Sequence, residues 1–210
     1  MNPIVLATAA LFGLGGLAVL GVVVFLVGNA WFGLPVGAQA PVQPIAFPHT
    51  VHAGTVEQGG LGLDCTFCHR NADKGPAATI PTVQQCMFCH AQVKGIAPTA
   101  QAQISILRNA SQAGQPIDWV RVHRLPDHVQ FVHDIHIRFL MANPGKVVNA
   151  SSALTLLPDG TVNAAQTCST CHGAVDTMVQ VKQVRALKMG DCVNCHRQNN
   201  GPTDCAICHY

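Results

Sequence analysis

The feature that most constrains this chain of 210 residues is the placement of its ten cysteines. Every cysteine belongs to a C-x-x-C pair, and a histidine follows each pair directly. The five motifs are Cys65–His69, Cys86–His90, Cys168–His172, Cys192–His196 and Cys205–His209. Two thiols three positions apart lie on one side of a helical turn, where both can join one porphyrin while the adjacent histidine reaches its iron. C-x-x-C-H is the attachment motif of c-type haem, so the sequence predicts five covalently bound haem c groups.

Other chemistries of paired cysteines explain this pattern less well. A zinc ribbon places about 15 to 20 residues between two C-x-x-C pairs, and the intervals from Cys68 to Cys86 and from Cys171 to Cys192 satisfy that spacing. However, five pairs is an odd number, and zinc does not require a histidine after every pair. Disulfides leave the histidines unexplained, and a thioredoxin-like redox centre needs one motif only.

The amino-terminal segment carries no charged side chain before Glu57. A helix over the apolar stretch from Ile4 to Val27 would be about 36 Å long, which is enough to cross a bilayer. A cleaved signal peptide is the alternative, because Ala38-Gln39-Ala40 is typical of a cleavage site. The apolar stretch is longer than that of a signal peptide and has no basic residue before it, so we expect residues 1–40 to be a transmembrane anchor and linker.

Haem c is attached outside the cytoplasm. We therefore expect a single-pass protein of the bacterial inner membrane, with membrane lipid around the anchor and the haem domain on the periplasmic side. The net charge of +2 comes without a basic patch, so nucleic-acid binding is not expected.

Histidines outside the five motifs are candidates for the sixth ligand of each iron. They are His49, His52, His123, His128, His133 and His136. Four of them lie in two copies of an F-x-H-x-x-H pattern, Phe47–His52 and Phe131–His136, and each copy precedes further C-x-x-C-H motifs. This order predicts a degenerate repeat, with a dihaem unit at 41–122 and a trihaem unit at 123–210. Six spare histidines for five irons give no reason to expect an open coordination site.

The fold class expected is mostly α with much irregular structure, comprising one transmembrane helix and a haem-packed multihaem cytochrome c domain. Only 5% of the residues are aromatic, so stacked porphyrins must supply most of the core. Apolar spacing predicts helices over 99–113 and 175–187. The turn residues Pro158-Asp159-Gly160 predict a short hairpin.

The order of these motifs resembles a known family. F-x-H-x-x-H followed by C-x-x-C-H is similar to the class III multihaem cytochromes. The longer pattern resembles the pentahaem cytochrome c component of bacterial alternative complex III. The stretches that carry this resemblance are FPHTVH, IPTVQQCMFCH, PIDWVRVHRLPDHVQFVHDIH, CSTCHGAV, MGDCVNCHR and the terminal CAICHY. Residues 144–165 resemble an insertion relative to that pattern.

The resemblance implies an electron-transfer subunit of a quinol:acceptor oxidoreductase complex, not an enzyme in itself. Electrons would enter from iron–sulfur and quinol-oxidising membrane subunits of the same complex. They would leave through another cytochrome c or a small copper protein. Two alternatives stay open, namely a stand-alone membrane quinol dehydrogenase and a multihaem reductase with one open catalytic haem.

The expected iron ligands follow from the motifs and the resemblance together. Proximal ligands are His69, His90, His172, His196 and His209, and distal ligands are His49, His52, His123, His133 and His136, with Met189 as an alternative. By analogy with the class III pattern, His49 would serve the first motif and His133 the third, while His52 and His136 cross to other haems. His123 is expected at the second motif. His128 stands where the family implies an aromatic residue.

Overall fold

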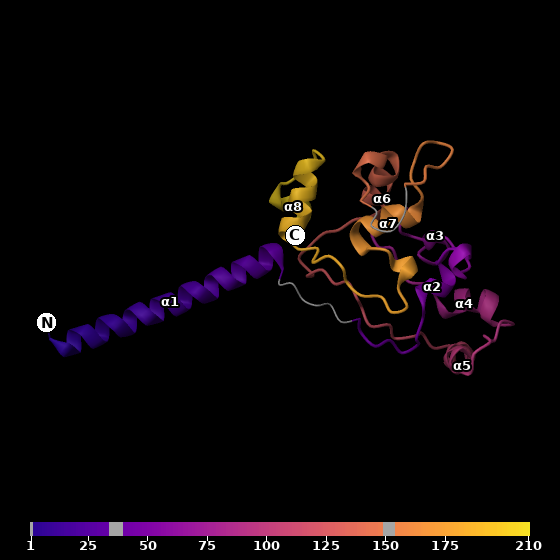
Figure 1. Cartoon of the computed structure of the whole chain (residues 1–210), viewed down its shortest axis with the longest axis horizontal. Coiled ribbons are helices and arrows are strands. Elements are labelled where there is room, and N and C mark those ends of the chain that lie inside the picture. The colour runs from indigo at the N-terminus through magenta and orange to yellow at the C-terminus, as the bar shows by residue number, and fades with distance from the viewer. Residues whose placement is uncertain (1, 34–39, 149–153) are drawn as a thin grey trace. The chain divides into compact units, whose positions relative to one another are not determined.

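The structure is a computed structural model that describes residues 2–33, 40–148 and 154–210 (Figure 1). These residues form helices joined by long irregular segments, with no strand among them. The α-helices are α1 (Pro3–Phe32), α2 (His49–His52), α3 (Cys65–Cys68), α4 (Val83–His90), α5 (Pro98–Ala113), α6 (His133–Ala142), α7 (Ala164–His172), α8 (Met189–Gln198) and α9 (Cys205–Cys208). Three 3₁₀ turns, Val56–Gln58, Pro144–Lys146 and Val175–Thr177, lie between them. This confirms the expected mostly helical, irregular class.

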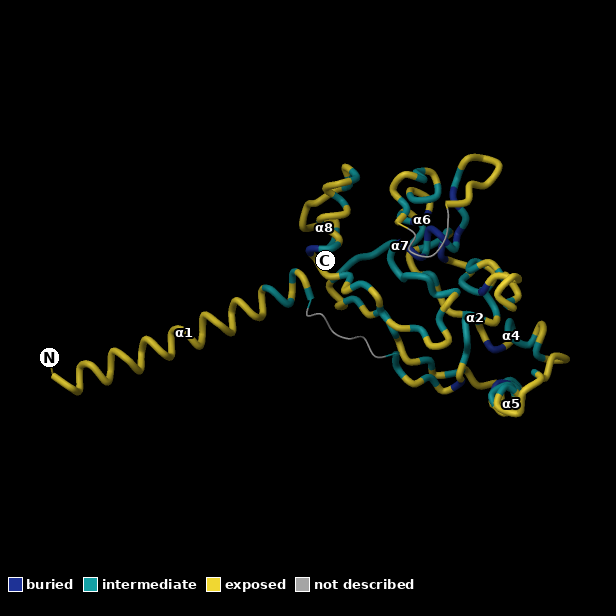
Figure 2. Tube along the Cα trace, viewed as in Figure 1, coloured by how far each residue is buried: buried dark blue, intermediate teal, exposed yellow. Residues whose placement is uncertain are grey.

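Helix α1 is the one helix in the described part of the chain that is long and apolar enough to cross a membrane. The side chain of Asn2 accepts a hydrogen bond from the Ile4 amide, and Pro3 occupies the first turn, where its missing N–H costs nothing. None of the residues of α1 is buried, as Figure 2 shows along its length. An exposed, uncharged helix with a mean hydropathy of 2.6 is what a lipid environment requires.

The chain forms two compact units. The first comprises residues 1–37 and 186–203, so that α1 and α8 belong together. The second comprises residues 38–185 and 204–210, and it contains the four other C-x-x-C-H motifs. The motif order predicts a different division, into the repeats 41–122 and 123–210, and that division stays a prediction.

Very few side chains form an apolar core. Among the described residues, the buried hydrophobic side chains are Ile45, Ala72, Val83, Leu107, Ile137, Val162 and Ala164. Ile45, Val83 and Leu107 form one cluster, against which Met87 and Trp119 pack. The cluster joins α5 to α4, which carries the second motif. So small a core cannot by itself stabilise a domain of this size.

Two of the three expected local elements are present. Helix α5 covers the predicted 99–113 segment, with Leu107 buried on its inner face. The turn at Pro158–Gly160 lies between Leu156 and Val162, which form an isolated antiparallel bridge, the smallest form of a hairpin.

The helix predicted over 175–187 is wrong. Only Val175–Thr177 forms a 3₁₀ turn, and irregular chain follows until α8 begins. The apolar spacing of this segment has the helical period, but valines at 179, 181 and 184 favour extended backbone. The methyl groups of Val184 lie instead against the backbone of Gly173.

Candidate haem-binding sites

Each C-x-x-C-H motif forms a single helical turn or the end of a short helix. Helices α3 and α9 consist of the C-x-x-C segment alone, whereas α4, α7 and α8 contain the whole motif. Polar residues before the motifs begin these turns. The Asp64 carboxylate accepts a hydrogen bond from the Thr66 amide at 2.7 Å, and the side chains of Thr82 and Asn163 cap α4 and α7 in the same way. The two thiols of each pair are therefore placed as the motif requires.

Backbone carbonyls orient four of the five proximal histidines. Nδ1 of His69 lies 2.6 Å from the Thr79 oxygen, and Nδ1 of His90 lies 3.2 Å from the Val93 oxygen. Nδ1 of His209 lies 3.3 Å from the His128 oxygen, and Nδ1 of His196 bonds the Pro202 oxygen. A carbonyl can only accept, so each Nδ1 carries a proton, and in the neutral ring Nε2 then has the lone pair. This is the arrangement in which a histidine binds a metal through Nε2.

The two F-x-H-x-x-H segments have nearly the same geometry. Phe47 stacks on His52 with ring centres 4.3 Å apart and planes at 24°, and Phe131 stacks on His136 at 4.5 Å and 24°. The first histidine of each pair meets the same phenylalanine edge-on, at 4.9 Å and 86° for His49 and 4.7 Å and 89° for His133. The phenylalanine thus fixes both imidazoles of each segment.

Backbone carbonyls also orient three candidate distal ligands. Nδ1 of His52 lies 3.2 Å from the Pro48 oxygen, and Nδ1 of His136 lies 2.7 Å from the Val132 oxygen, at corresponding positions of the two segments. Nδ1 of His133 lies 2.9 Å from the Pro76 oxygen. These three histidines also present Nε2 for coordination.

One proximal and one distal candidate lie at a distance that suits a shared metal. The ring centres of His52 and His90 are 6.0 Å apart. Two imidazoles that bind one metal from opposite sides, with bonds of about 2 Å, have ring centres about 6 Å apart. The sequence predicts His123 at this motif and His52 at a haem other than the first; the structure brings His52 close to His90, and the ligand of this motif stays a prediction.

His123 lies beside a different proximal histidine. Its ring centre is 4.5 Å from that of His172, edge to face, and its Nε2 is buried without a hydrogen-bond partner. His133 lies within electrostatic range of His172, and His69 within that of His49. The class III analogy assigns His133 to the third motif and His49 to the first, and these assignments stay predictions.

His128 lies beside the fifth motif, where sequence reasoning assigned it no role. Its ring stacks on that of His209 at 5.5 Å and 20°, and its carbonyl accepts the hydrogen bond from Nδ1 of His209. Because Nδ1 points away from a metal bound at Nε2, the His128 backbone lies on the side of His209 remote from that metal. His128 therefore orients the imidazole of His209, and an antiparallel bridge from its neighbour Val129 to His209 holds it there. The signal available in the sequence was the six spare histidines for five motifs.

Burial keeps several of these imidazoles neutral. Desolvation, together with the nearby charges of His69 and His52, lowers the pKa of His49 to about 4. Desolvation and the neighbouring His123, His133 and His69 lower the pKa of His172 to about 4. Burial lowers the pKa of His123 as well. Only neutral imidazole binds a metal, so these sites favour the ligating form.

Cysteines of different motifs lie close together in the second unit. Helix α3, which carries Cys65, packs on α7, and the thiols of Cys65 and Cys168 lie close enough to shift each other's pKa. Cys68 likewise lies within electrostatic range of Cys86 of the second motif. None of the ten cysteines, all of which lie in the described ranges, forms a disulfide. The first motif therefore lies beside both the second and the third.

The donor set and its surroundings fit haem c. Thiols on helical turns and oriented imidazoles supply the attachment and ligation chemistry, and the partnerless Nε2 of His123 is a buried donor that needs a partner. Apolar side chains within the motifs, such as Phe88 at 66% exposure and Ile207 at 51%, are suited to contact a porphyrin. Among the described residues, no three His, Cys, Asp or Glu side chains converge to hold a bare metal ion.

Comparisons with known proteins identify a relative of this chain, although no protein-family model matches it. The chain is similar to a protein of Nitratidesulfovibrio vulgaris (strain Hildenborough) described as menaquinone reductase, multiheme cytochrome c subunit. The two are 25% identical over 210 aligned residues, which cover 90% of this chain and 87% of the relative. The similarity supports the class of multihaem c-type cytochromes for this chain.

Proposed function

We propose that this protein is a membrane-anchored pentahaem c-type cytochrome that relays electrons. Haem c would be attached through five cysteine pairs: Cys65 and Cys68, Cys86 and Cys89, Cys168 and Cys171, Cys192 and Cys195, Cys205 and Cys208. The observation that carries this proposal is that all five motifs lie on helical turns and four of their histidines are oriented through Nδ1. Haem supplies reversible one-electron chemistry, and the chain supplies attachment, ligation and spacing.

The iron ligands proposed from the chain are histidines. The proximal set is His69, His90, His172, His196 and His209. The distal set is His49, His52, His123, His133 and His136, with Met189 as an alternative that would raise the potential of its haem. The geometry supports His52 opposite His90, and it supports His49 at the first motif and His133 or His123 at the third. The repeated geometry of the two F-x-H-x-x-H segments favours His136 at the fourth motif, as the counterpart of His52 at the second.

A relay is favoured over an enzyme by the closeness of the motifs. The helices of the first and third motifs pack together, and thiols of the first and second motifs lie within electrostatic range of each other. Such spacing suits electron transfer between neighbours, whereas a catalytic haem needs an open coordination position and a substrate pocket. A multihaem reductase remains the second candidate only if one iron lacks its sixth ligand.

The resemblance to alternative complex III and the similarity to the menaquinone reductase component both support a role in electron transfer that involves a quinone. We propose a subunit of a quinol-oxidising complex, with iron–sulfur and quinol-oxidising membrane partners and a cytochrome c or copper protein as acceptor. The haem domain would lie on the periplasmic face of the bacterial inner membrane. The name of the relative favours a variant of this proposal, in which the same relay delivers electrons toward menaquinone.

The test uses the complex purified in detergent from its native membrane. Intact-mass analysis should show five haems on this chain, and the spectrum should show all five irons low-spin, with no carbon monoxide bound after reduction. Co-purifying proteins identify the partners. Reduction of the haems by menaquinol supports electron flow from the quinol to the relay. Reduction of menaquinone by the reduced haems supports electron flow in the opposite direction. Fewer than five haems, or a stoichiometric high-spin haem, would overturn the pentahaem relay.

A further inference from the structure

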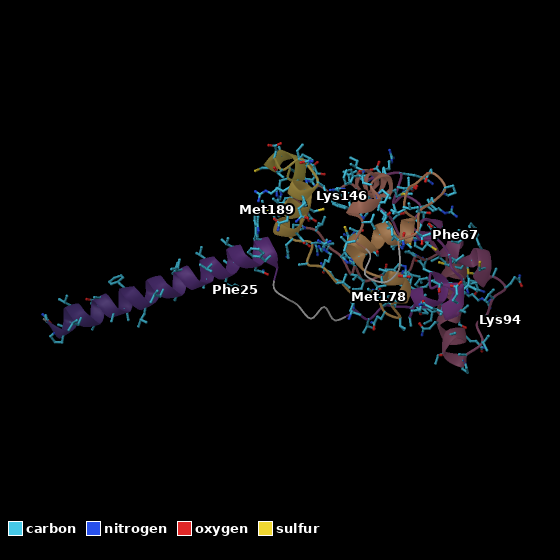
Figure 3. All side chains as sticks on the ribbon, turned by 45° about the horizontal axis from the view of Figure 1, so that its top comes forward. Phe25, Phe67, Lys94, Lys146, Met178 and Met189 are labelled. Atoms are coloured by element: carbon cyan, nitrogen blue, oxygen red, sulfur yellow. The ribbon has the colours of Figure 1, made fainter. Side chains whose placement is uncertain are left out.

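The fourth motif differs from the other four because it shares a compact unit with the apolar helix. Helix α8 carries Cys192, Cys195 and His196, and it packs on the carboxyl-terminal end of α1 (Figure 1). Figure 3 labels Met189 at the start of α8, beside that end of α1. The contact is thus made by the turn that leads directly into the motif.

The contact depends on a glycine. Gly190 is buried, and a Cβ atom placed on it would lie 2.6 Å from both Nε1 and the carbonyl oxygen of Trp31. Real Cβ atoms do not come so close to other atoms, so only glycine permits this approach. A second approach lies alongside, because a Cβ on Gly33, which has φ of +74°, would lie 2.9 Å from the Ala186 Cβ and 3.0 Å from the Lys188 Cγ.

The depth of this contact follows from the length of α1. The uncharged apolar stretch ends at Val27, and Trp31 lies about 6 Å further along the helix axis. Headgroup layers extend about 5 to 7 Å beyond the hydrocarbon on each side. Trp31 therefore reaches the headgroup layer, where tryptophan is enriched, and Lys188 places an ammonium at the same level.

We infer that Trp31 and Gly190 are a positioning pair that holds the fourth C-x-x-C-H motif at the lipid headgroups. The inference rests on the proposed function, since it concerns the haem that Cys192 and Cys195 would bind. It assigns to this motif the place where electrons are exchanged with the membrane phase, whose carriers are lipid-soluble. The other four motifs belong to the second compact unit.

The experiment measures lipid contact of the holoprotein in phosphatidylcholine vesicles. The vesicles contain phosphatidylethanolamine with a photoreactive diazirine on its headgroup, and a parallel set contains phosphatidylcholine with the diazirine in mid-chain. After irradiation, mass analysis locates the crosslinks. In the wild type, the headgroup probe should label the peptide with Met189–Gln198, and the mid-chain probe should label α1 instead.

The test variant is Gly190→Val, and its matched control is Gly145→Val. A Cβ at Gly145 meets nothing within 4 Å, so the control tests the substitution without the contact. The Gly190 variant should lose headgroup labelling of α8 about fivefold or more, while the control keeps it. If Gly190→Val fails to accumulate, Trp31→Leu tests the same contact from the α1 side.

Two results would overturn the inference. They are a wild-type α8 that the headgroup probe does not label, and labelling that persists in the Gly190 and Trp31 variants. The mass of the same α8 peptide reports independently whether it carries haem. An α8 peptide that is labelled but lacks haem would refute the proposed function and leave the contact standing, so the two failures are distinguishable.

Discussion

Replacing His52 by alanine should open the second haem motif to external ligands. His52 is the imidazole that faces His90 with ring centres 6.0 Å apart, a separation that suits one iron between them. Alanine cannot reach the iron, so the haem at Cys86 and Cys89 would become five-coordinate. The reduced holoprotein should then bind about one equivalent of carbon monoxide, where the wild type binds almost none.

The stability cost of the same change can be worked from the structure. The His52 ring stacks on Phe47 at 4.3 Å, and such a pair contributes about 1 kcal/mol beyond its buried area. In a domain of this size, each 1 kcal/mol lowers the unfolding midpoint by about 2–4 °C. The loss of an iron–nitrogen bond adds to this, so a fall of at least about 2 °C is expected in a thermal melt followed by the haem absorbance.

The controls separate this assignment from its rival. His128→Phe removes an imidazole that lies beside His209 on the side remote from the iron, and its carbonyl stays in place, so no carbon monoxide should bind. His123→Ala tests the pairing expected from sequence. If His123→Ala opens the haem at Cys86 and Cys89 while His52→Ala leaves it closed, the reasoning from ring geometry is refuted.

Three further predictions concern stability and the backbone. Leu107→Ala should lower the free energy of unfolding, measured in urea, by about 2–5 kcal/mol. Its control is Ile106→Ala on the exposed face of α5, which should change that free energy by less than about 1 kcal/mol. Equal effects of the two substitutions would contradict the assignment of Leu107 to the core. Arg108 donates to the carbonyl oxygens of His90 at 2.8 Å and Ala91 at 3.3 Å. Arg108→Ala should therefore lower the free energy of unfolding by about 1–3 kcal/mol in the same assay. Arg108→Lys should be more stable than Arg108→Ala but less stable than the wild type, because an ammonium lacks the forked geometry of the guanidinium. Gly173→Ala places a Cβ 2.7 Å from Val184 at a φ of +72°, so the thermal midpoint should fall. The added substitution Val184→Ala removes the steric clash and should recover only that part of the loss. Full recovery would show that the backbone at position 173 is not strained.

The elements predictable from sequence were those that local chemistry decides. A cysteine pair, its histidine and a capping residue such as Asp64 lie within one helical turn, so the motif specifies its own conformation. The apolar spacing of residues 99–113 predicts helix α5, and in the structure Pro98 lies in its first turn and Gly114 caps its end. The apolar spacing of residues 175–187 wrongly predicts a helix. The β-branched residues there favour extended backbone, and the segment packs against Gly173.

The distal pairings depend on long-range contacts that spacing does not encode. His52 meets His90 only because Ile45, Val83 and Leu107 pack the chain before α2 against α4 and α5. His128 acts through its backbone carbonyl, and a carbonyl has no signature in the sequence. The grouping of α8 with α1 likewise depends on Gly190, whose role is visible only beside Trp31.

The scarcity of buried apolar side chains has a consequence for how this protein is made in the cell. Before its cofactors are attached, the newly synthesised chain has only a cluster such as Ile45, Val83 and Leu107 to drive collapse. On the proposed function, the chain would stay largely unfolded until haem is attached, and its ten thiols would have to be kept reduced until then. Haem attachment then becomes the step that commits the chain to its native state. Biogenesis would be limited by cofactor supply and thiol reduction, and chains that miss these steps would be substrates for proteolysis.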